Sequence, residues 1–429
     1  MLFVGALALG AAVSLVWREG SNVPFQDDWD MVPALTGHEP VNLSFLWSQH
    51  NEHRIPVPKL IFLALSWPTR GDSRAGMFFN LLALAAASLA LVVCARRLRG
   101  RISYTDGFFP LACLNLSQYQ NLIWNFQIQL ITATNLACAL LLMVAWRPAS
   151  LTLRSALWVT ALLLCLALSG ASGLVFVPPL AAWLIWTGWR QPGQRRGKSG
   201  RRDWAIPLCG ASAIAVFLLY FYHYQQPQEH PLPSGLLPVG RACIEFLSVS
   251  VGLVGEDGWP YSGLAVFALY AATLALLLRA LKTVPGERQR AAGLLAFLLG
   301  TGMLALSVGL GRGGFGPGAA FASRYVTLSI PLLCCVYLVW GLYARTLGGR
   351  ACQAGLFLVL ALTSFPSGAR AFEAGAELRR AIGAFEGALV RGVPPERLAD
   401  RYWPVLYPDR DILAQRLSML RETRMGPYR

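Results

Sequence analysis

The chain of 429 residues is 55% hydrophobic and 14% charged, and its 37 Lys and Arg against 22 Asp and Glu give a net charge of +15. A soluble globular domain carries about 25% charged residues, so this composition excludes a soluble enzyme, and it equally excludes a disordered chain. Several apolar runs approach or exceed the roughly 20 residues that cross a bilayer core. The sequence therefore predicts an all-α polytopic membrane protein.

The positive charge is concentrated in alternate loops between the apolar runs. Five loops hold 18 Lys and Arg with three acids, whereas the three loops that alternate with them hold eight bases with eleven acids. Short cytoplasmic loops collect Lys and Arg, so the excess indicates membrane topology, and nucleic acid is not an expected partner. The basic loops are 96–106, 147–154, 189–203, 279–290 and 345–351.

This charge pattern predicts about eleven spans, with the N-terminus inside the cell. We expect them at 1–17, 76–95, 107–121, 127–146, 155–169, 174–188, 204–222, 263–281, 291–311, 325–345 and 352–366. Pro178-Pro179 lies within one of them, which must kink there or be a broken helix. Residues 1–17 are also compatible with a cleaved signal peptide, but no basic segment precedes the apolar run, and this favours a retained first helix.

The chain divides into a transmembrane body, 1–366, and a tail, 367–429. The body includes a long first outer loop, 18–75, which is rich in Trp, His, Asp and Pro. In the tail, helical periodicity at 371–392 and 409–423, with a further stretch opened by Pro394-Pro395, predicts a small helical cap. Span parity places this cap on the outer, periplasmic side. The Arg-, Ala- and Gly-rich composition favours a bacterial inner membrane.

Two adjacent carboxylates, Asp27 and Asp28, lie between Phe25 and Trp29 at the start of the first outer loop. Carboxylates within hydrogen-bonding reach disfavour joint ionisation, so one pKa should rise, which suits a general base. The alternative is an acidic turn or a helix cap at the exit of the first span. We favour a catalytic role for this pair.

A second polar cluster follows in the same loop and contains His50, Glu52, His53 and Arg54. On a helix, His50, His53 and Arg54 would share one face. The guanidinium of Arg54 matches phosphate oxygens, and the two histidines, with Asp28, are candidate ligands for a divalent cation such as Mg or Mn. The His-x-x-His spacing alone is weakly specific. The alternative is an interfacial helix whose polar face is only hydrated.

Polar residues also mark the outer ends of later spans. Asn125 and Gln127 are amides at membrane depth, which line polar cavities or join helices by hydrogen bonds. Arg312 and Arg324, followed by Tyr325, flank a glycine-rich loop beside an apolar slab. Arginines in this position can bind a lipid-linked phosphate, and anchoring to lipid headgroups is the alternative.

The order of these features resembles the GT-C-type glycosyltransferases, which use polyprenyl-phosphate sugar donors on the outer face of the membrane. The segments that carry the likeness are similar to those of a group of bacterial membrane proteins labelled as glycosyltransferases. They are Gln26-Asp27-Asp28-Trp29, His50-Asn51-Glu52-His53-Arg54, Trp124-Asn125-Phe126-Gln127 and Ser323-Arg324-Tyr325. The resemblance covers the order of elements over most of the body and covers the tail only loosely.

The resemblance implies a GT-C-like helical bundle with a base in the first outer loop, at Asp27 or at its close alternative Asp28. The base would deprotonate a hydroxyl of a lipid or cell-envelope glycan acceptor as it attacks the sugar and displaces polyprenyl phosphate. A divalent cation is permitted and not required. The expected substrate-binding residues are His50, Glu52, His53, Arg54, Asn125, Gln127, Arg312, Arg324 and Tyr325.

The chain departs from the better-known branches of that group. Its tail is too short for the outer domain of oligosaccharyltransferases, and its acidic pair is Asp-Asp where the protein mannosyltransferase and aminoarabinose transferase branches have Asp-Glu. Two other classes remain as alternatives, namely a transporter or flippase of lipid-linked sugars and an O-antigen polymerase or ligase. A transporter or flippase is less favoured because internal repeats and charges at mid-span are absent from the sequence. A polymerase or ligase is less favoured because the late outer loop is short.

Overall fold

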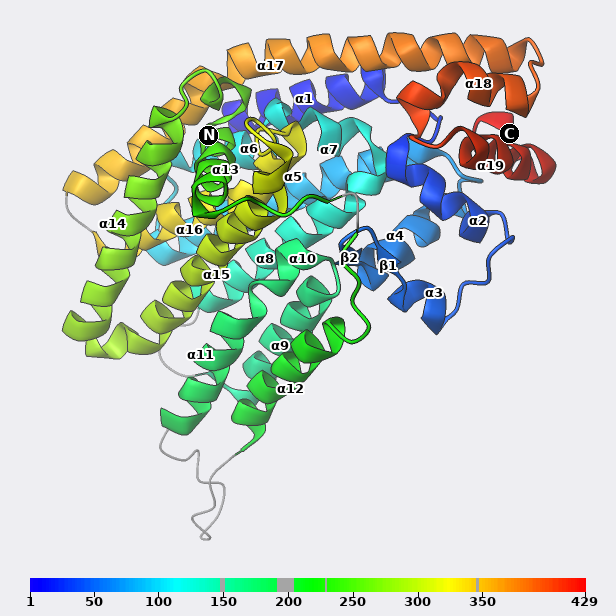
Figure 1. Cartoon of the computed structure of the whole chain (residues 1–429). Helices are drawn as coiled ribbons and strands as arrows, with labels where there is room; N and C mark the ends of the chain where they lie inside the picture. The colour runs from blue at the N-terminus through cyan, green and yellow to red at the C-terminus, as the bar shows by residue number, and fades with distance from the viewer. Residues whose placement is uncertain (147–150, 191–203, 228–229, 345–346) are drawn as a thin grey trace.

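The computed structural model describes residues 1–146, 151–190, 204–227, 230–344 and 347–429. Within these ranges the regular structure is helical apart from one two-stranded hairpin. Three of the basic loops predicted from the sequence, 147–154, 189–203 and 345–351, extend outside the described residues. The chain is an all-α protein with the helices of a multi-pass membrane protein (Figure 1).

Eight helical segments of the described chain are long and apolar enough to cross a membrane, judged by length and composition. They contain α1 (Leu2–Glu19), α5 (Ser73–Arg99), α8 (Ile128–Trp146), α10 with α11 (Ala171–Leu174 and Val177–Arg190), α14 (Tyr261–Thr283), α15 (Arg288–Arg312), α16 (Val326–Tyr343) and α17 (Leu347–Val390). Two shorter apolar helices, α9 (Leu153–Ala167) and α12 (Ala205–Tyr220), overlap two further expected spans. Helix α16 is central, because every residue from Val326 to Val339 is buried.

The expected span 107–121 is not a continuous helix. The structure instead has α6 (Phe108–Cys113), η3 (Leu116–Gln118) and α7 (Tyr119–Ile123). The break follows from Asn115, whose side chain accepts a hydrogen bond from the Ser117 amide and so competes with the helical pattern. The segment still returns the chain along α5, since Arg99 pairs with Asp106 at one end.

At the other end of α5, Gly76 lies directly against the Asn125 side chain. A Cβ atom at this glycine would fall 1.6 Å from Asn125 Oδ1, so only glycine allows this approach. Pro178 and Pro179 occupy the first turn of α11, where a missing amide hydrogen costs nothing. The predicted span is interrupted, but the break between α10 and α11 lies at residues 175–176, just before the two prolines, and α11 continues through them.

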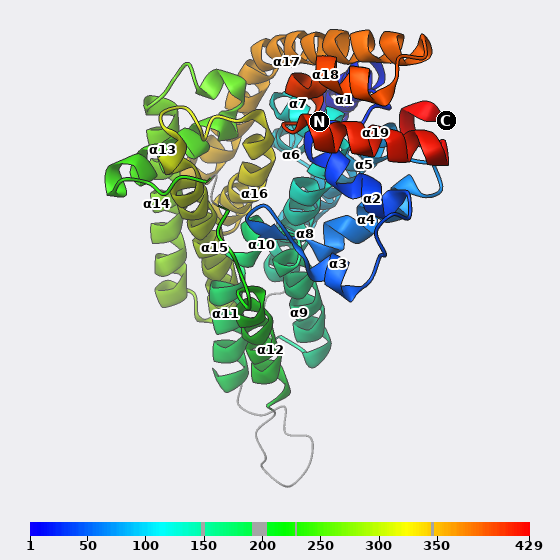
Figure 2. The ribbon, with the colours of Figure 1, turned by 45° about the vertical axis from the view of Figure 1, so that its right-hand side comes forward.

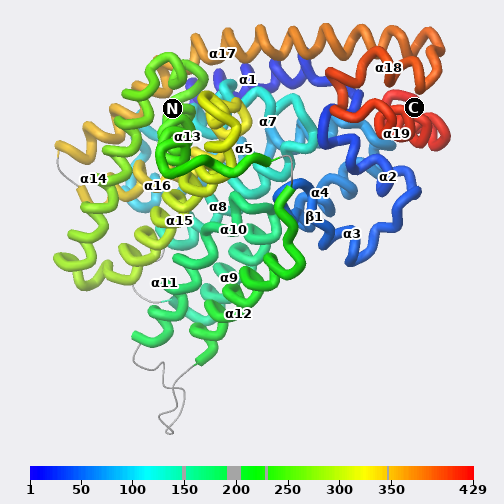
Figure 3. The backbone as a smooth tube through the Cα atoms, viewed as in Figure 1, coloured from blue at the N-terminus to red at the C-terminus, as the bar shows by residue number. Residues whose placement is uncertain are grey.

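The boundary expected between body and tail, 366/367, falls inside a continuous helix. Helix α17 runs for 44 residues with Pro366 in its interior, and its orange tube follows the edge of the molecule in Figure 3. Proline removes one hydrogen bond, and here the helix continues beyond it. The tail then forms α18 (Pro395–Leu406), α19 (Arg410–Thr423) and η10 (Gly426–Tyr428), so its helical stretches are confirmed.

The first outer loop and the tail share one hydrophobic core. The loop contains η1 (Gln26–Met31), α2 (Val32–Leu35), α3 (Leu43–Trp47), the hairpin of β1 (Gln49–His50) and β2 (His53–Arg54), and α4 (Pro56–Ser66). Trp29 of the loop is fully buried in a cluster with Phe385, Leu398 and Leu417 of the tail. Figure 2 shows α19 alongside α2.

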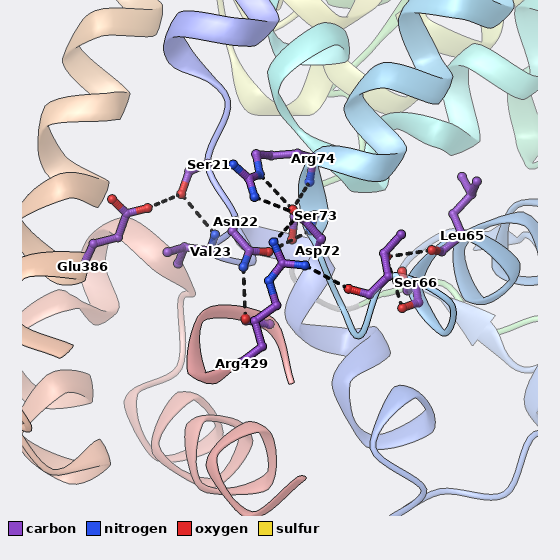
Figure 4. Close-up of polar contacts among 12 residues, drawn as sticks. Ser21, Asn22, Val23, Leu65, Ser66, Asp72, Ser73, Arg74, Glu386 and Arg429 are labelled. Carbon is purple, nitrogen blue, oxygen red and sulfur yellow. Dashed lines mark hydrogen bonds and ion pairs between the residues drawn. The ribbon is translucent and has the colours of Figure 1, made fainter. Parts of the chain in front are cut away.

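Polar contacts hold the tail to both ends of this loop (Figure 4). After α1, Ser21 Oγ donates to Glu386 at 2.8 Å, and Asn22 Nδ2 donates to the Gly426 carbonyl at 3.0 Å. Before α5, Arg429 pairs with Asp72 at 2.6 Å. The tail is therefore part of the structure that positions the first outer loop.

Candidate functional site

The second polar cluster of the first outer loop forms a hairpin, so the predicted helical face of His50, His53 and Arg54 is wrong. The strands pair in the register Gln49 opposite Arg54 and His50 opposite His53. Residues directly opposite each other point to the same face of an antiparallel pair. The turn needs a left-handed residue, and Asn51 supplies it with a φ of 47°. The two histidines therefore share one face, and Arg54 lies on the other.

Asp27 and Asp30 approach the first of these histidines from η1. His50 Nε2 lies 3.9 Å from Asp27 Oδ2, and its Nδ1 lies 3.5 Å from Asp30 Oδ2. Two tail residues hold the other oxygen of Asp30, since Tyr407 donates at 2.7 Å and Arg416 at 2.6 Å. The Asp27 side chain is 30% exposed and therefore accessible to a ligand.

Asp27, Asp30 and His50 each offer a ligand atom within 4.8 Å of the others, a spacing that could hold a metal ion. Carboxylate oxygens with an imidazole nitrogen suit Mg or Mn as well as other divalent ions. The predicted metal set, Asp28, His50 and His53, is thus corrected: within the described ranges only His50 of that set belongs to the group. The sequence analysis did not identify Asp30 or its tail partners.

Asp28 points into the protein and is only 2% exposed. Its Oδ2 accepts a hydrogen bond from the Phe25 amide at 2.9 Å, and the backbone of Phe126 also interacts with the carboxyl group. Burial raises the pKa of Asp28 well above the ordinary value of 3.8, opposed by the Phe25 amide and assisted by the charge of Asp27. Asp28 therefore fixes the turn that presents Asp27.

We expect Asp28→Asn to raise thermal stability at neutral pH. A folded-state pKa above the unfolded value means that this carboxyl stabilises the fold fully below 3.8 and that the contribution is lost as the pH rises through the folded pKa. An asparagine keeps the acceptor for Phe25 without a buried charge. The check is the thermal midpoint of both proteins from about pH 5 to about pH 8. A gap between them that does not widen with pH would contradict the expectation.

Arg54 does not present its guanidinium to a ligand. Only 4% exposed, it donates to the backbone carbonyls of Trp47, Tyr220 and Tyr222 at 2.6, 3.0 and 2.8 Å and has a longer contact to His223 O. All three of its nitrogens are thus occupied by carbonyl oxygens. The geometry does not support the predicted role of Arg54 as a phosphate ligand. Arg54 instead holds the loop after α12 to the hairpin.

Glu52, at the tip of the hairpin, is the centre of a second charged group. Its carboxylate lies 3.1 Å from Arg312 Nη2, 3.1 Å from His230 Nδ1 and 3.7 Å from His53 Nε2. Burial alone would raise the pKa of Glu52, but the nearby His53 and Arg312 hold it below its usual range. Burial lowers the pKa of His53. His230 is a single histidine in a proline-rich outer segment, and no local pattern of the sequence marks it as a site residue.

This charged group forms the polar end of a cavity of about 310 Å³. Glu52, His53, His230 and Arg312 line one part of it, and Leu304, Val308 and Leu328 of the membrane helices α15 and α16 line another. A pocket with a few convergent polar groups and an apolar remainder is the usual form of a small-molecule site. This cavity suits a ligand with an anionic group joined to a hydrocarbon chain.

Arg312 and Arg324 flank the ring of Tyr325, which also lines the cavity. Their guanidinium carbons lie 5.8 and 5.4 Å from the ring centroid. Arg312 lines the cavity, whereas Arg324 does not. Asn121 accounts for the backbone geometry here, since its Nδ2 donates to the Arg324 carbonyl at 2.9 Å.

Asn125 and Gln127 are buried below the hairpin, at 2% and 1% exposure, and neither lines the cavity. Phe126 between them packs against His50 with the ring centroids 4.7 Å apart. The neighbouring Gln129 of α8 lines the cavity instead. Contrary to the sequence prediction, Asn125 and Gln127 are therefore not placed to contact a ligand in the cavity. They lie on either side of Phe126, which packs against His50.

The hairpin connects the group around Asp27 with the group around Glu52. Asp27 contacts His50, His50 is paired across the strands with His53, and His53 lines the cavity. The accessible carboxylate of Asp27 is thus connected, through His50 and His53, to a cavity that has a cationic arginine and an apolar interior.

No protein-family model, curated protein or solved structure matches this chain. The Asp27 group and the Glu52 group are therefore the features of this chain that bear on its function.

Proposed function

We propose that this protein is a GT-C-type glycosyltransferase of the bacterial inner membrane. It moves a sugar from a polyprenyl-phosphate donor to a hydroxyl of a lipid or cell-envelope glycan acceptor on the periplasmic face. The observation that carries the proposal is the accessible Asp27, which is connected through His50 and His53 to a cavity with Arg312 at its polar end and the apolar surface of α15 and α16 beyond it.

In this proposal Asp27 is the general base. It takes the proton of the acceptor hydroxyl while that oxygen attacks the anomeric carbon of the sugar, and the bond to phosphate breaks. Asp28 holds the turn through the Phe25 amide, and Phe126 supports the His50 ring from below. Asp27, Asp30 and His50 are the residues that would hold a divalent cation, which would supply Lewis-acid polarisation of a bound substrate oxygen.

Arg312 is the residue proposed to bind the donor phosphate. A guanidinium can form bidentate hydrogen bonds with phosphate oxygens. Glu52 contacts only the Nη2 atom of Arg312, at 3.1 Å. Glu52 thereby orients Arg312 and leaves its other nitrogens for the ligand. His230 and His53 add donors on the same wall of the cavity.

The proposal is tested with the full-length protein in proteoliposomes, supplied with a panel of polyprenyl-phosphate-linked sugars. A transferase releases free polyprenyl phosphate, which mass spectrometry detects. A transporter or flippase would move the same lipids between leaflets without cleaving them. Movement without release, across the panel, would overturn the enzymatic proposal in favour of transport.

Arg312→Gln is expected to lower kcat/KM for the donor by about tenfold to a hundredfold, because a charge-assisted hydrogen bond contributes about 1.5–3 kcal/mol. The matched control is Arg370→Gln, an arginine with a 46% exposed side chain that pairs with Asp257 on the surface. Initial rates of polyprenyl phosphate release are measured for both variants. Equal losses in the two variants, or none in Arg312→Gln, would remove Arg312 from the donor site.

A further inference from the structure

A second cavity, of about 770 Å³, lies on the other side of the hairpin from the Glu52 cavity. We call it the hairpin groove, and its walls come from α3, the hairpin and the segment that follows α12 (Figure 1). The residues that matter for its chemistry are Trp47, Gln49, Asn51, Tyr222, Gln225 and Gln226. The proposed transfer chemistry uses none of these side chains.

The groove is built by two side chains that hold the segment after α12 against the hairpin. Arg54 donates to the carbonyls of Tyr220 and Tyr222 from one side. Gln49 pairs with the backbone of Gln225 in both directions, donating at 2.5 Å and accepting at 3.1 Å. Four hydrogen bonds from two side chains thus fix the walls, so the groove is part of the folded structure.

The lining of the groove favours an uncharged ligand with many hydroxyl groups. No Asp, Glu or Lys occurs among the described residues that line it, and the only arginine, Arg54, has its nitrogens occupied by carbonyl oxygens. Amide side chains such as Asn51 and Gln226 both donate and accept hydrogen bonds, as hydroxyl groups require. Tyr222, 64% exposed, offers a flat ring with a polar end.

The groove also lies next to the residues of the proposed reaction. Asn51 Nδ2 is 3.4 Å from His50 Nε2, the nitrogen that faces Asp27. Gln226 and Pro227 line both the hairpin groove and the Glu52 cavity. Asn51 therefore links the groove to the histidine that contacts Asp27, and Gln226 and Pro227 lie between the groove and the Glu52 cavity.

We infer that the hairpin groove binds the acceptor as a neutral glycan, an inference that rests on the proposed function. A hydroxyl of the glycan gives its proton to Asp27, and its oxygen bonds to the anomeric carbon of the donor sugar. The bond from that carbon to the phosphate oxygen breaks, and polyprenyl phosphate leaves with the electron pair. The acceptor is thus a carbohydrate held by amides and aromatic rings, and its recognition requires no charge.

The test is binding of neutral hexasaccharides of glucose, mannose and galactose to the full chain in nanodiscs, followed by saturation-transfer NMR. Tyr222→Ala is expected to weaken binding of the retained sugar about tenfold, a loss of about 1.4 kcal/mol. Asn51→Gly is expected to weaken it similarly, because glycine keeps the left-handed backbone and removes only the amide. Tyr261→Ala, an 80% exposed tyrosine at the start of α14, is the control and leaves binding unchanged.

Three results would overturn the inference: binding of none of the hexasaccharides, binding that survives both groove variants, or displacement of the sugar by inorganic phosphate. Asp27→Asn, which removes the base, is expected to bind the sugars like the parent protein. Groove-dependent binding without release of polyprenyl phosphate from any donor would support the groove and count against glycosyl transfer. Conversely, the protein could turn over a donor while neither Tyr222→Ala nor Asn51→Gly alters the KM for the acceptor. That result would support glycosyl transfer and count against the groove.

Discussion

Asp27→Asn is expected to lower kcat for sugar transfer by about a thousandfold, the scale of general base catalysis by a positioned side chain. An amide cannot accept the proton of the acceptor hydroxyl, and no second carboxylate replaces it. Asp28 is buried at 2% exposure, and one oxygen of Asp30 is already held by Tyr407 and Arg416. The rate of polyprenyl phosphate release with saturating donor and acceptor measures the loss.

The matched control is Asp28→Asn, which changes the adjacent carboxyl in the same way. We expect it to retain most of the activity, because an asparagine still accepts the hydrogen bond from the Phe25 amide. Expression, membrane insertion and the thermal midpoint of Asp27→Asn should match the parent protein, since its side chain makes no hydrogen bond within the described structure. Loss of turnover in Asp28→Asn alone, with Asp27→Asn active, would transfer the role of the base to Asp28.

The spans of this protein were predictable because hydrophobicity is a local property of the sequence. Ten of the eleven expected spans each fall mainly on one helix of the described chain, and eight of these helices belong to segments long and apolar enough to cross a membrane. The exception, 107–121, carries its own signal in Asn115, Ser117 and Gln118, polar residues that are buried in the structure. Side chains of this kind compete with the helical backbone for hydrogen bonds, and a count of apolar residues ignores that competition.

The candidate site was predicted in part. The first outer loop was identified because Asp27, His50 and Glu52 are polar residues crowded next to apolar spans. Their relative positions were not predictable, because the spacing of His50, His53 and Arg54 fits a helical face and yet occurs in a hairpin. The sequence did hold one hint, since Pro56 disfavours a helical conformation at Ile55 and in fact begins α4.

Partners supplied by distant parts of the chain could not be found from local patterns. Glu52 and Arg312 are 260 positions apart, and Asp30 and Arg416 are 386 apart. Each of these residues alone has an ordinary interpretation as a surface charge. Tertiary packing alone brings them together, and it makes the tail a neighbour of the proposed base.

Arg54→Met is expected to lower the free energy of unfolding by about 3 kcal/mol or more, because buried carbonyls that lose a charged donor each cost about 1–3 kcal/mol. The carbonyls of Trp47, Tyr220 and Tyr222 would lose their donors together. Heating in the presence of a thiol-reactive dye measures the change, since cysteines such as Cys94 and Cys334 are buried until the protein unfolds. Arg370→Gln is the exposed-arginine control, with an expected effect below about 1 kcal/mol.

Arg54→Lys separates a structural role from a phosphate-binding role for this side chain. A single ammonium cannot reach the carbonyls on both sides that the planar guanidinium joins, so the structural role predicts a lowered thermal midpoint even though the charge is kept. It also predicts weaker oligosaccharide binding, because the walls of the hairpin groove depend on Arg54. A normal midpoint with a raised KM for the donor alone would instead make Arg54 a phosphate ligand, as its sequence context first indicated.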